Sequence, residues 1–243
     1  GYFGQPHILA RFMAVKSSAQ IKQARRIAMV WVIICLWFAV VVGMVGRVYL
    51  GDRLGAGGSE TVFMVMVHDI VHPLIAGIVL SAILAAVMST ADSQLLVTSS
   101  AITEDFYRVL LRPSATDREL VWVGRFAVLG VAVAAFLIGL NPDSSVLRLV
   151  AYAWGGFGAT FGPVIILSLF WKRMTRNGAM AGLIVGGVTV LIWKQLHGGI
   201  FEMYEIVPGF AFSVIAIIGI SLMCRPPSPA IQDEFDSVGA SQI

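Results

Sequence analysis

Residues 73–94 read PLIAGIVLSAILAAVMSTADSQ, and this stretch decides the class of fold. It begins as an apolar run that, with its continuation, is long enough to cross the hydrocarbon core of a bilayer, which takes about 20 residues. The run then ends in a polar group, because Ser89, Thr90 and Asp92 follow closely on one another. Polar side chains at membrane depth are costly and commonly have a function. The stretch therefore predicts a transmembrane helix with a functional polar end.

The composition of the whole chain agrees with this interpretation. Of its 243 residues 58% are hydrophobic and only 13% are charged, and the mean hydropathy is +0.85. Ordinary soluble domains carry roughly 25% charged residues. A soluble protein of this size could not cover so much apolar surface with so little charge. The composition excludes a soluble enzyme, a disordered chain and a free nucleic-acid-binding protein, and it predicts an all-α polytopic membrane protein.

Further apolar runs predict six full membrane spans and one partial span. We expect a half-helix at residues 1–14 and spans at about 27–50, 73–103, 119–141, 146–172, 177–197 and 204–225. Lipid offers the backbone no hydrogen-bond partners, so every span is predicted to be helical. Residues 1–225 would form a single transmembrane domain. The polar, acidic residues 226–243 would form a disordered tail.

The positions of the basic residues predict the orientation of the spans. Segments 11–26, 108–125 and 172–176, together with Arg225, hold most of the 17 Lys and Arg residues. The positive-inside rule places these segments, and the tail at 226–243, in the cytoplasm. The basic pI is thereby explained by topology, so we expect membrane lipid and no nucleic acid as a partner. The natural location is a plasma membrane, in a bacterium the inner membrane.

Two connecting segments are predicted to be partly helical. Ser59 and Glu60, followed by an apolar run, predict a short helix at the outer surface, either as a plain interfacial helix or as a cap over an entry path. Residues 103–119 carry charges of both signs and are expected to continue the preceding helix beyond the membrane.

The polar end of the span at 73–103 has the oxygens that a sodium ion requires. On a helix, Ser89 and Thr90 project about 100° apart, so both hydroxyls can flank one cation. The carbonyl of Ala86 lies one turn earlier and can add a third oxygen. The alternative is that both hydroxyls bond back to carbonyls of their own helix. Asp92 lines an ion path or is simply solvated at the cytoplasmic mouth.

The first seven residues, GYFGQPH, do not favour a continuous helix, because two glycines and a proline fall within six positions. Many secondary transporters expose backbone groups to substrate at such interrupted helices near the bilayer midplane. The alternative is a loop that leads into a helix at Pro6.

Three separated motifs resemble the sodium:solute symporter family and, within it, the sodium/proline symporters. They are residues 1–7, residues 88–105 and the segment Trp171-Lys172-Arg173 with Gly178, Ala179 and Gly182. The resemblance implies a LeuT-type fold of two inverted five-helix repeats. The chain would hold the second repeat and two accessory helices, without the first repeat. It opens with Gly1 inside a motif, so we expect it to be the C-terminal part of a longer protein that alone cannot transport.

The resemblance also implies the activity and the residues that carry it out. The activity is sodium-coupled symport of L-proline or a similar small zwitterion, with no enzymatic step and no cofactor besides the coupling ion. Ala86, Ser89 and Thr90 match the family's sodium ligands on its eighth core helix. Tyr2 and Pro6 match its substrate-contacting residues, and Gln5 lies between them. Two alternatives remain open, namely a transporter-like sensor region and a symporter of another organic solute such as pantothenate.

Overall fold

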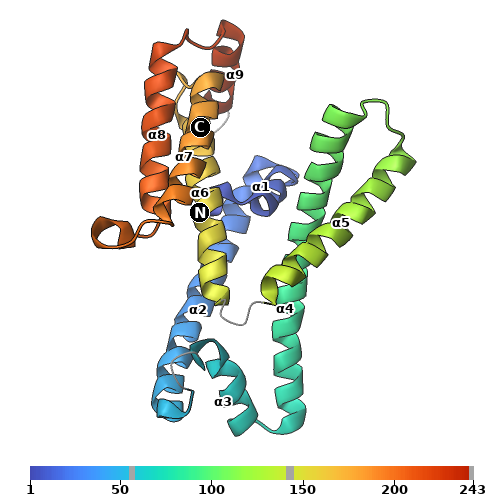
Figure 1. Cartoon of the computed structure of the whole chain (residues 1–243), viewed down its shortest axis with the longest axis vertical. Helices are drawn as coiled ribbons and strands as arrows, with labels where there is room; N and C mark the ends of the chain where they lie inside the picture. The colour runs from blue at the N-terminus through green and yellow to red at the C-terminus, as the bar shows by residue number, and fades with distance from the viewer. Residues whose placement is uncertain (55–57, 141–144, 241–243) are drawn as a thin grey trace. The chain divides into compact units, whose positions relative to one another are not determined.

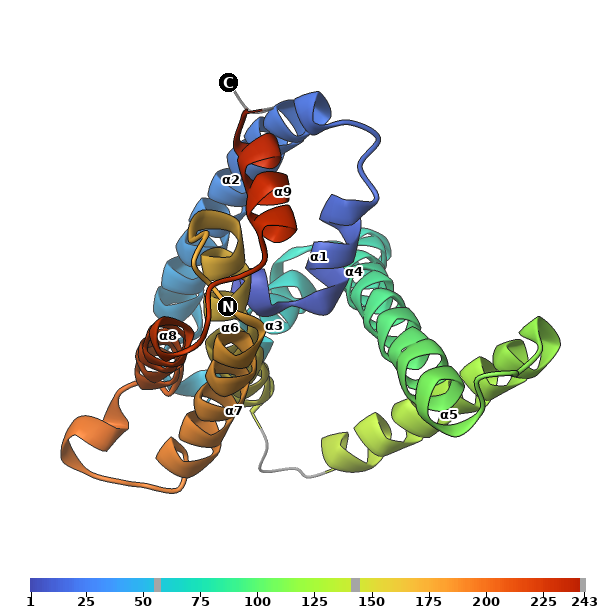
Figure 2. The ribbon, with the colours of Figure 1, turned by 90° about the horizontal axis from the view of Figure 1, so that it is seen from above.

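The computed structural model describes residues 1–54, 58–140 and 145–240, and every regular element in these ranges is helical (Figures 1 and 2). The chain divides into two compact units, each described by itself. Unit 1 comprises Gly1–Met13 and Asp143–Ile243, and unit 2 comprises Ala14–Pro142. The elements of unit 1 are η1 (Tyr2–Gly4), α1 (Pro6–Met13), α6 (Val146–Phe170), α7 (Arg176–Trp193), η5 (Gly199–Glu202), α8 (Ile206–Met223) and α9 (Pro229–Ala240). Those of unit 2 are α2 (Ser18–Leu50), η2 (Gly51–Leu54), η3 (Gly58–Thr61), α3 (Val62–Ile70), α4 (Pro73–Ser100), η4 (Ala101–Leu111) and α5 (Asp117–Gly139).

Six helices in the described part of the chain are long and apolar enough to cross a membrane. They are α2, α4 with its continuation η4, α5, α6, α7 and α8. An all-helical chain with six candidate spans confirms the predicted class of polytopic membrane protein. The orientation of the spans and their arrangement in inverted repeats stay predictions.

The core of unit 1 is the contact between α7 and α8, which lie side by side in both views (Figures 1 and 2). The α7 face is made of glycines four residues apart, and a Cβ atom on Gly182 would collide with the side chain of Ile217. Ser213 lies on the same α8 face, fully buried, and its hydroxyl donates to the Gly182 carbonyl at 2.9 Å. Small residues allow two backbones to approach closely, and membrane helices associate in this way.

The C-terminal tail corrects one prediction from the sequence. We predicted disorder after residue 226, and this is wrong for Pro229–Ala240, which form α9. Ile231 and Phe235 lie four residues apart on this helix and line a cavity with the ends of α7 and α8. Asp236 makes an ion pair with Lys172. The tail folds because its few apolar residues fall on one helical face.

Unit 2 is built from longer and less buried helices. The helix α2 runs for 33 residues to Leu50 and is followed by Gly51, whose φ of +52° is a conformation that favours glycine. The segment after it contains the predicted short helix, which begins as η3 and continues as α3. Arg53 and Asp69 join the two ends of this segment through an ion pair of 3.0 Å. Its place at the outer surface stays a prediction.

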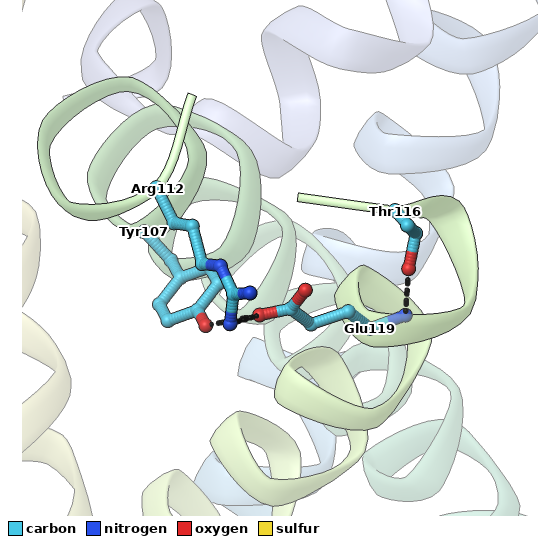
Figure 3. A network of polar contacts seen from close by, with 4 residues as sticks. All are labelled: Tyr107, Arg112, Thr116 and Glu119. Atoms are coloured by element: carbon cyan, nitrogen blue, oxygen red, sulfur yellow. Dashed lines mark hydrogen bonds and ion pairs between the residues drawn. The ribbon is translucent and has the colours of Figure 1, made fainter. Parts of the chain in front are cut away.

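A polar network closes the turn between η4 and α5 (Figure 3). The helix that begins at Pro73 continues as π-helical turns to Leu111, so the predicted continuation is present but ends before residue 119, and its place beyond the membrane stays a prediction. The Tyr107 hydroxyl donates to Oε1 of Glu119 at 2.6 Å, and Nη1 of Arg112 donates to the same oxygen at 2.8 Å. The amide of Glu119 donates to the Thr116 hydroxyl, which caps α5. The turn is thus held by one carboxylate with two donors.

Candidate functional site

The segment before α1 is interrupted, and its own sequence explains the interruption. Tyr2–Gly4 form a single 3₁₀ turn, Gln5 is extended with φ −87° and ψ 112°, and α1 begins at Pro6. A residue before proline is pushed out of the helical region, and proline itself fits the first position of a helix. The break therefore falls at Gln5 for a local, steric reason.

Gly4 fixes this interrupted segment against α6. A Cβ atom on Gly4 would overlap the carbonyl group of Phe157 and lie 2.8 Å from the amide nitrogen of Gly158. Since both neighbours are backbone atoms, they cannot move aside as a flexible side chain could. Only glycine allows this approach, and it holds the residues on either side of Gly4 close to the centre of α6.

The predicted substrate residues differ in their exposure. Tyr2 is 55% exposed, and its ring centre lies 6.3 Å from that of Trp154 on α6 at an interplanar angle of 55°. Pro6 is also exposed. Gln5 between them is only 4% exposed, and its Nε2 has no hydrogen-bond partner among the described residues. A buried donor without a partner costs about 1–3 kcal/mol. Gln5 therefore holds a donor ready for a hydrogen-bond acceptor.

The three predicted sodium ligands lie together on α4. The Ser89 hydroxyl donates to the Ala86 carbonyl at 2.9 Å, and the Thr90 hydroxyl donates to the same carbonyl at 3.2 Å. This is the back-bonded arrangement that the alternative interpretation predicts, and it also brings the three oxygens to one point. All three residues are exposed in this chain.

Neighbouring hydroxyls show what is distinctive about this pair. Ser81 and Ser93 also bond back to their own helix, to the carbonyls of Gly77 and Ser89. Back-bonding therefore occurs along much of α4 and does not by itself mark a site. Two hydroxyls that share one carbonyl occur, within the described part of α4, only at Ser89 and Thr90. Asp92 follows on the next turn and is exposed.

The two groups of predicted residues belong to different units. Tyr2, Gln5 and Pro6 lie in unit 1, whereas Ala86, Ser89, Thr90 and Asp92 lie in unit 2. Each group is locally well defined, and each presents unused hydrogen-bonding capacity inside a largely apolar chain.

Comparison with known proteins decides the family. The model of the sodium:solute symporter family matches residues 1–186 of the chain. The chain belongs to the sodium:solute symporter family. It is also similar to the sodium/proline symporters of Salmonella typhimurium and Escherichia coli K12, each 54% identical over 245 residues. It is 49% identical over 237 residues to the high-affinity proline transporter PutP of Bacillus subtilis.

The matches cover nearly all of this chain and about half of each relative. The two enterobacterial alignments cover 99% of the chain and 48% of the relative, and the Bacillus alignment covers 97% and 50%. These relatives are transporters and not enzymes. Family membership and six candidate spans make the chain a multi-pass plasma-membrane protein.

One buried polar group of this chain was not predicted from its sequence. Glu205 immediately precedes α8 and is 7% exposed, and its Oε1 lies 3.7 Å from Nζ of Lys194. The adjacent Tyr204 hydroxyl donates to the Ala151 carbonyl of α6 at 2.5 Å. Burial raises the pKa of the Tyr204 hydroxyl, and the negative charge of Glu205 raises it further. The available signal was a carboxylate placed directly before an apolar run.

Proposed function

We propose that the whole protein carries L-proline, or a similar small zwitterion, together with sodium across the plasma membrane. The proposal rests on sequence identity: nearly the whole chain aligns with bacterial proline transporters, at 54% identity in Salmonella typhimurium and 49% in Bacillus subtilis. In this proposal the chain is the second inverted repeat of a LeuT-type fold with two accessory helices. Residues 1–14 form one half of a broken core helix, and α9 lies in the cytoplasm.

We place the coupling ion at Ala86, Ser89 and Thr90. A carbonyl oxygen has two lone pairs, and in α4 the helical bond from the Thr90 amide already engages the Ala86 carbonyl, to which both hydroxyls also donate. Sodium can therefore reach that oxygen only when at least one hydroxyl hydrogen rotates away. After this rotation the hydroxyl oxygens can ligate the ion. The same three groups can therefore form hydrogen bonds with one another when no ion is present, and bind the ion when it is. The remaining ligands would come from the first repeat.

Coupling then follows from differential affinity. A sodium ion held between α4 and the first repeat stabilises the state in which both contact the ion, and substrate binds that state better. The inward gradient drives the cycle, because a membrane potential of 100 mV contributes about 2.3 kcal/mol per charge. Asp92, one turn beyond the site, would line the path by which the ion leaves.

We place the substrate at the interrupted segment. Tyr2 and Pro6 present exposed surface, and Gln5 supplies a buried amide donor without a partner. A zwitterionic amino acid carries a carboxylate that accepts hydrogen bonds, so the Gln5 amide is suited to receive that group.

The test is uptake of radiolabelled proline by the whole protein in proteoliposomes, with and without an inward sodium gradient. We expect accumulation that depends on the gradient and is competed by unlabelled proline. Proline uptake of equal size with and without the sodium gradient would contradict the coupling. Gradient-driven uptake of pantothenate with none of proline would contradict the proposed substrate.

A further inference from the structure

A cavity of about 690 Å³ lies at one end of α7 and α8, under α9. Every residue that lines it belongs to unit 1. Its walls combine two chemistries. Trp171, Met174 and Phe235 supply apolar surface, while the basic residues Lys172, Arg176 and Arg225 supply positive charge. A ligand that fills this cavity must therefore be both anionic and partly apolar.

The positive charge of the cavity is only partly neutralised. Lys172 makes an ion pair with Asp236 of α9. Arg176 and Arg225 are exposed and make no ion pair with another described residue. Arg173, next in sequence to Lys172, donates to the Cys224 carbonyl at 3.2 Å, and its Nη1 is buried without a hydrogen-bond partner in the described part of the chain. Of the three basic residues that line the cavity, only Lys172 pairs with a described carboxylate, and Arg173 lies beside the lining.

The cavity lies where a membrane surface would be. The helix α6 ends at Phe170, α7 begins at Arg176 and α8 ends at Met223, so three candidate spans change from apolar to basic at this place. Aromatic and basic residues mark the level of the lipid headgroups. An anionic phospholipid places its phosphate at that level and its glycerol and acyl chains beside apolar side chains, and basic pockets between spans bind such headgroups.

We propose that this cavity binds the headgroup of an anionic phospholipid and that Asp236 competes with the headgroup for Lys172. Free phosphate carries the same kind of charge, but it has no apolar part that could contact Trp171 and Phe235. The lipid, with both parts, matches the whole cavity. The helix α9 is then a displaceable wall that the lipid moves by replacing one carboxylate. The proposal is independent of the transported substrate.

The first test counts bound lipid by native mass spectrometry. The purified whole protein is equilibrated with phosphatidylglycerol or phosphatidylcholine in detergent, and a Lys172→Gln/Arg176→Gln/Arg225→Gln variant is compared with the unmodified protein. The matched control, Lys22→Gln/Arg25→Gln/Arg26→Gln, removes the same charge from exposed positions on α2. We expect phosphatidylglycerol retention to fall by roughly fivefold for each basic residue removed from the cavity, and to stay near wild type in the control. Equal loss in both variants, or equal retention of phosphatidylcholine, would overturn the proposal.

The second test keeps all the basic residues and predicts a rise in lipid retention, where the first predicts a fall. Asp236→Asn removes the carboxylate that pairs with Lys172, whereas Asp233→Asn removes another exposed charge of the same helix that makes no ion pair with another described residue. We expect Asp236→Asn to raise phosphatidylglycerol retention about fivefold and Asp233→Asn to leave it unchanged. No rise, or an equal rise in both, would overturn the competition. Saturation of the cavity by inorganic phosphate alone, with displacement of lipid at equal concentration, would assign it to a free anion instead.

Discussion

The three helices α6, α7 and α8 bury each other, whereas α2, α4 and α5 remain largely exposed. In the most apolar windows of α6 and α8, 28% of the residues are buried, compared with 6% in α4 and none in α2 or α5. The difference does not come from hydropathy, because α2 is the most apolar of the six by this measure. Within unit 1 the close packing follows from residue size along one face. Gly178, Gly182 and Gly186 let α7 approach its neighbours closely.

The exposed helices differ in a second way, which bears on function. The surface of α4 carries Ser81, Ser89 and Thr90, with hydroxyls that bond only to their own helix. Each of these hydroxyls satisfies its donor within the helix, and its oxygen remains able to accept a hydrogen bond or ligate a cation. Unit 1 thus shows how a membrane protein closes a core, whereas the role of this face of α4 in binding an ion stays a proposal.

The largest effect is expected where the packing is tightest. A Cβ on Gly186 would lie 2.5 Å from the Ala159 carbonyl oxygen, whereas one on Gly77 of α4 would meet nothing within 4 Å. We expect Gly186→Val to cost more than about 3 kcal/mol of stability, because backbone atoms cannot yield. Thermal unfolding of the purified protein measures this. A loss of equal size in Gly77→Val would remove the contrast between the two units.

The next effect concerns the shared carbonyl. Ser89→Ala or Thr90→Ala should raise the sodium concentration for half-maximal proline uptake by at least about tenfold, since a lost bond to a charged group costs about 1.5–3 kcal/mol. Ser81→Ala is the matched control, because it removes the same kind of back-bond from the same helix. Sodium dependence that is unchanged in all three variants would exclude the ion site from Ser89 and Thr90.

A comparable effect on the other ligand is expected at the interrupted segment. Tyr2→Ala removes the ring that neighbours Trp154 and should raise the KM for proline about tenfold while leaving the sodium requirement nearly unchanged. Tyr2→Phe keeps the ring and separates the role of the hydroxyl. Equal changes in the proline and sodium requirements would contradict a direct role in substrate binding.

A substitution of Gln5 should raise the KM for proline by a smaller factor and should not lower the stability of the protein. Gln5→Leu removes a buried amide whose Nε2 has no partner, so the protein should be no less stable than wild type. The KM for proline should nevertheless rise, by about fivefold, because the donor for the carboxylate is lost. Steady-state uptake and thermal unfolding are measured together. An unchanged KM would show that the amide does not serve the substrate.

The smallest effect is expected in the turn between η4 and α5 (Figure 3). Glu119 accepts from both Tyr107 and Arg112, whereas the exposed Glu104 pairs with Arg108 alone. Glu119→Gln should lower the melting temperature by about 2 °C, and Glu104→Gln should have a smaller effect, because exposed pairs contribute little. The opposite ranking would show that the network does not hold the turn.

Most of the helices could be predicted because apolar runs of sufficient length have only one stable form in lipid. The break at Gln5 could also be predicted, since Pro6 acts on the residue before it through local sterics. The helix α9 was missed because its average composition is polar, and the placement of Ile231 and Phe235 on one face was overlooked. Tertiary packing of two side chains outweighed composition.

The candidate site was only partly predictable. The spacing of Ala86, Ser89 and Thr90 was sufficient to place their oxygens together, because helix geometry alone determines it. The burial of Gln5 and of Glu205 could not be predicted from the sequence, because both depend on packing against α6. In the case of Gln5, this helix lies more than a hundred residues away in sequence. Such contacts between distant segments leave no local pattern.

The most direct test of the sodium site is an experimental structure of the whole protein with sodium and proline bound. We predict an ion in contact with the Ala86 carbonyl and with the hydroxyls of Ser89 and Thr90, and at least one of the two back-bonds broken. Both hydroxyls still donating to Ala86, with sodium bound elsewhere, would contradict the account.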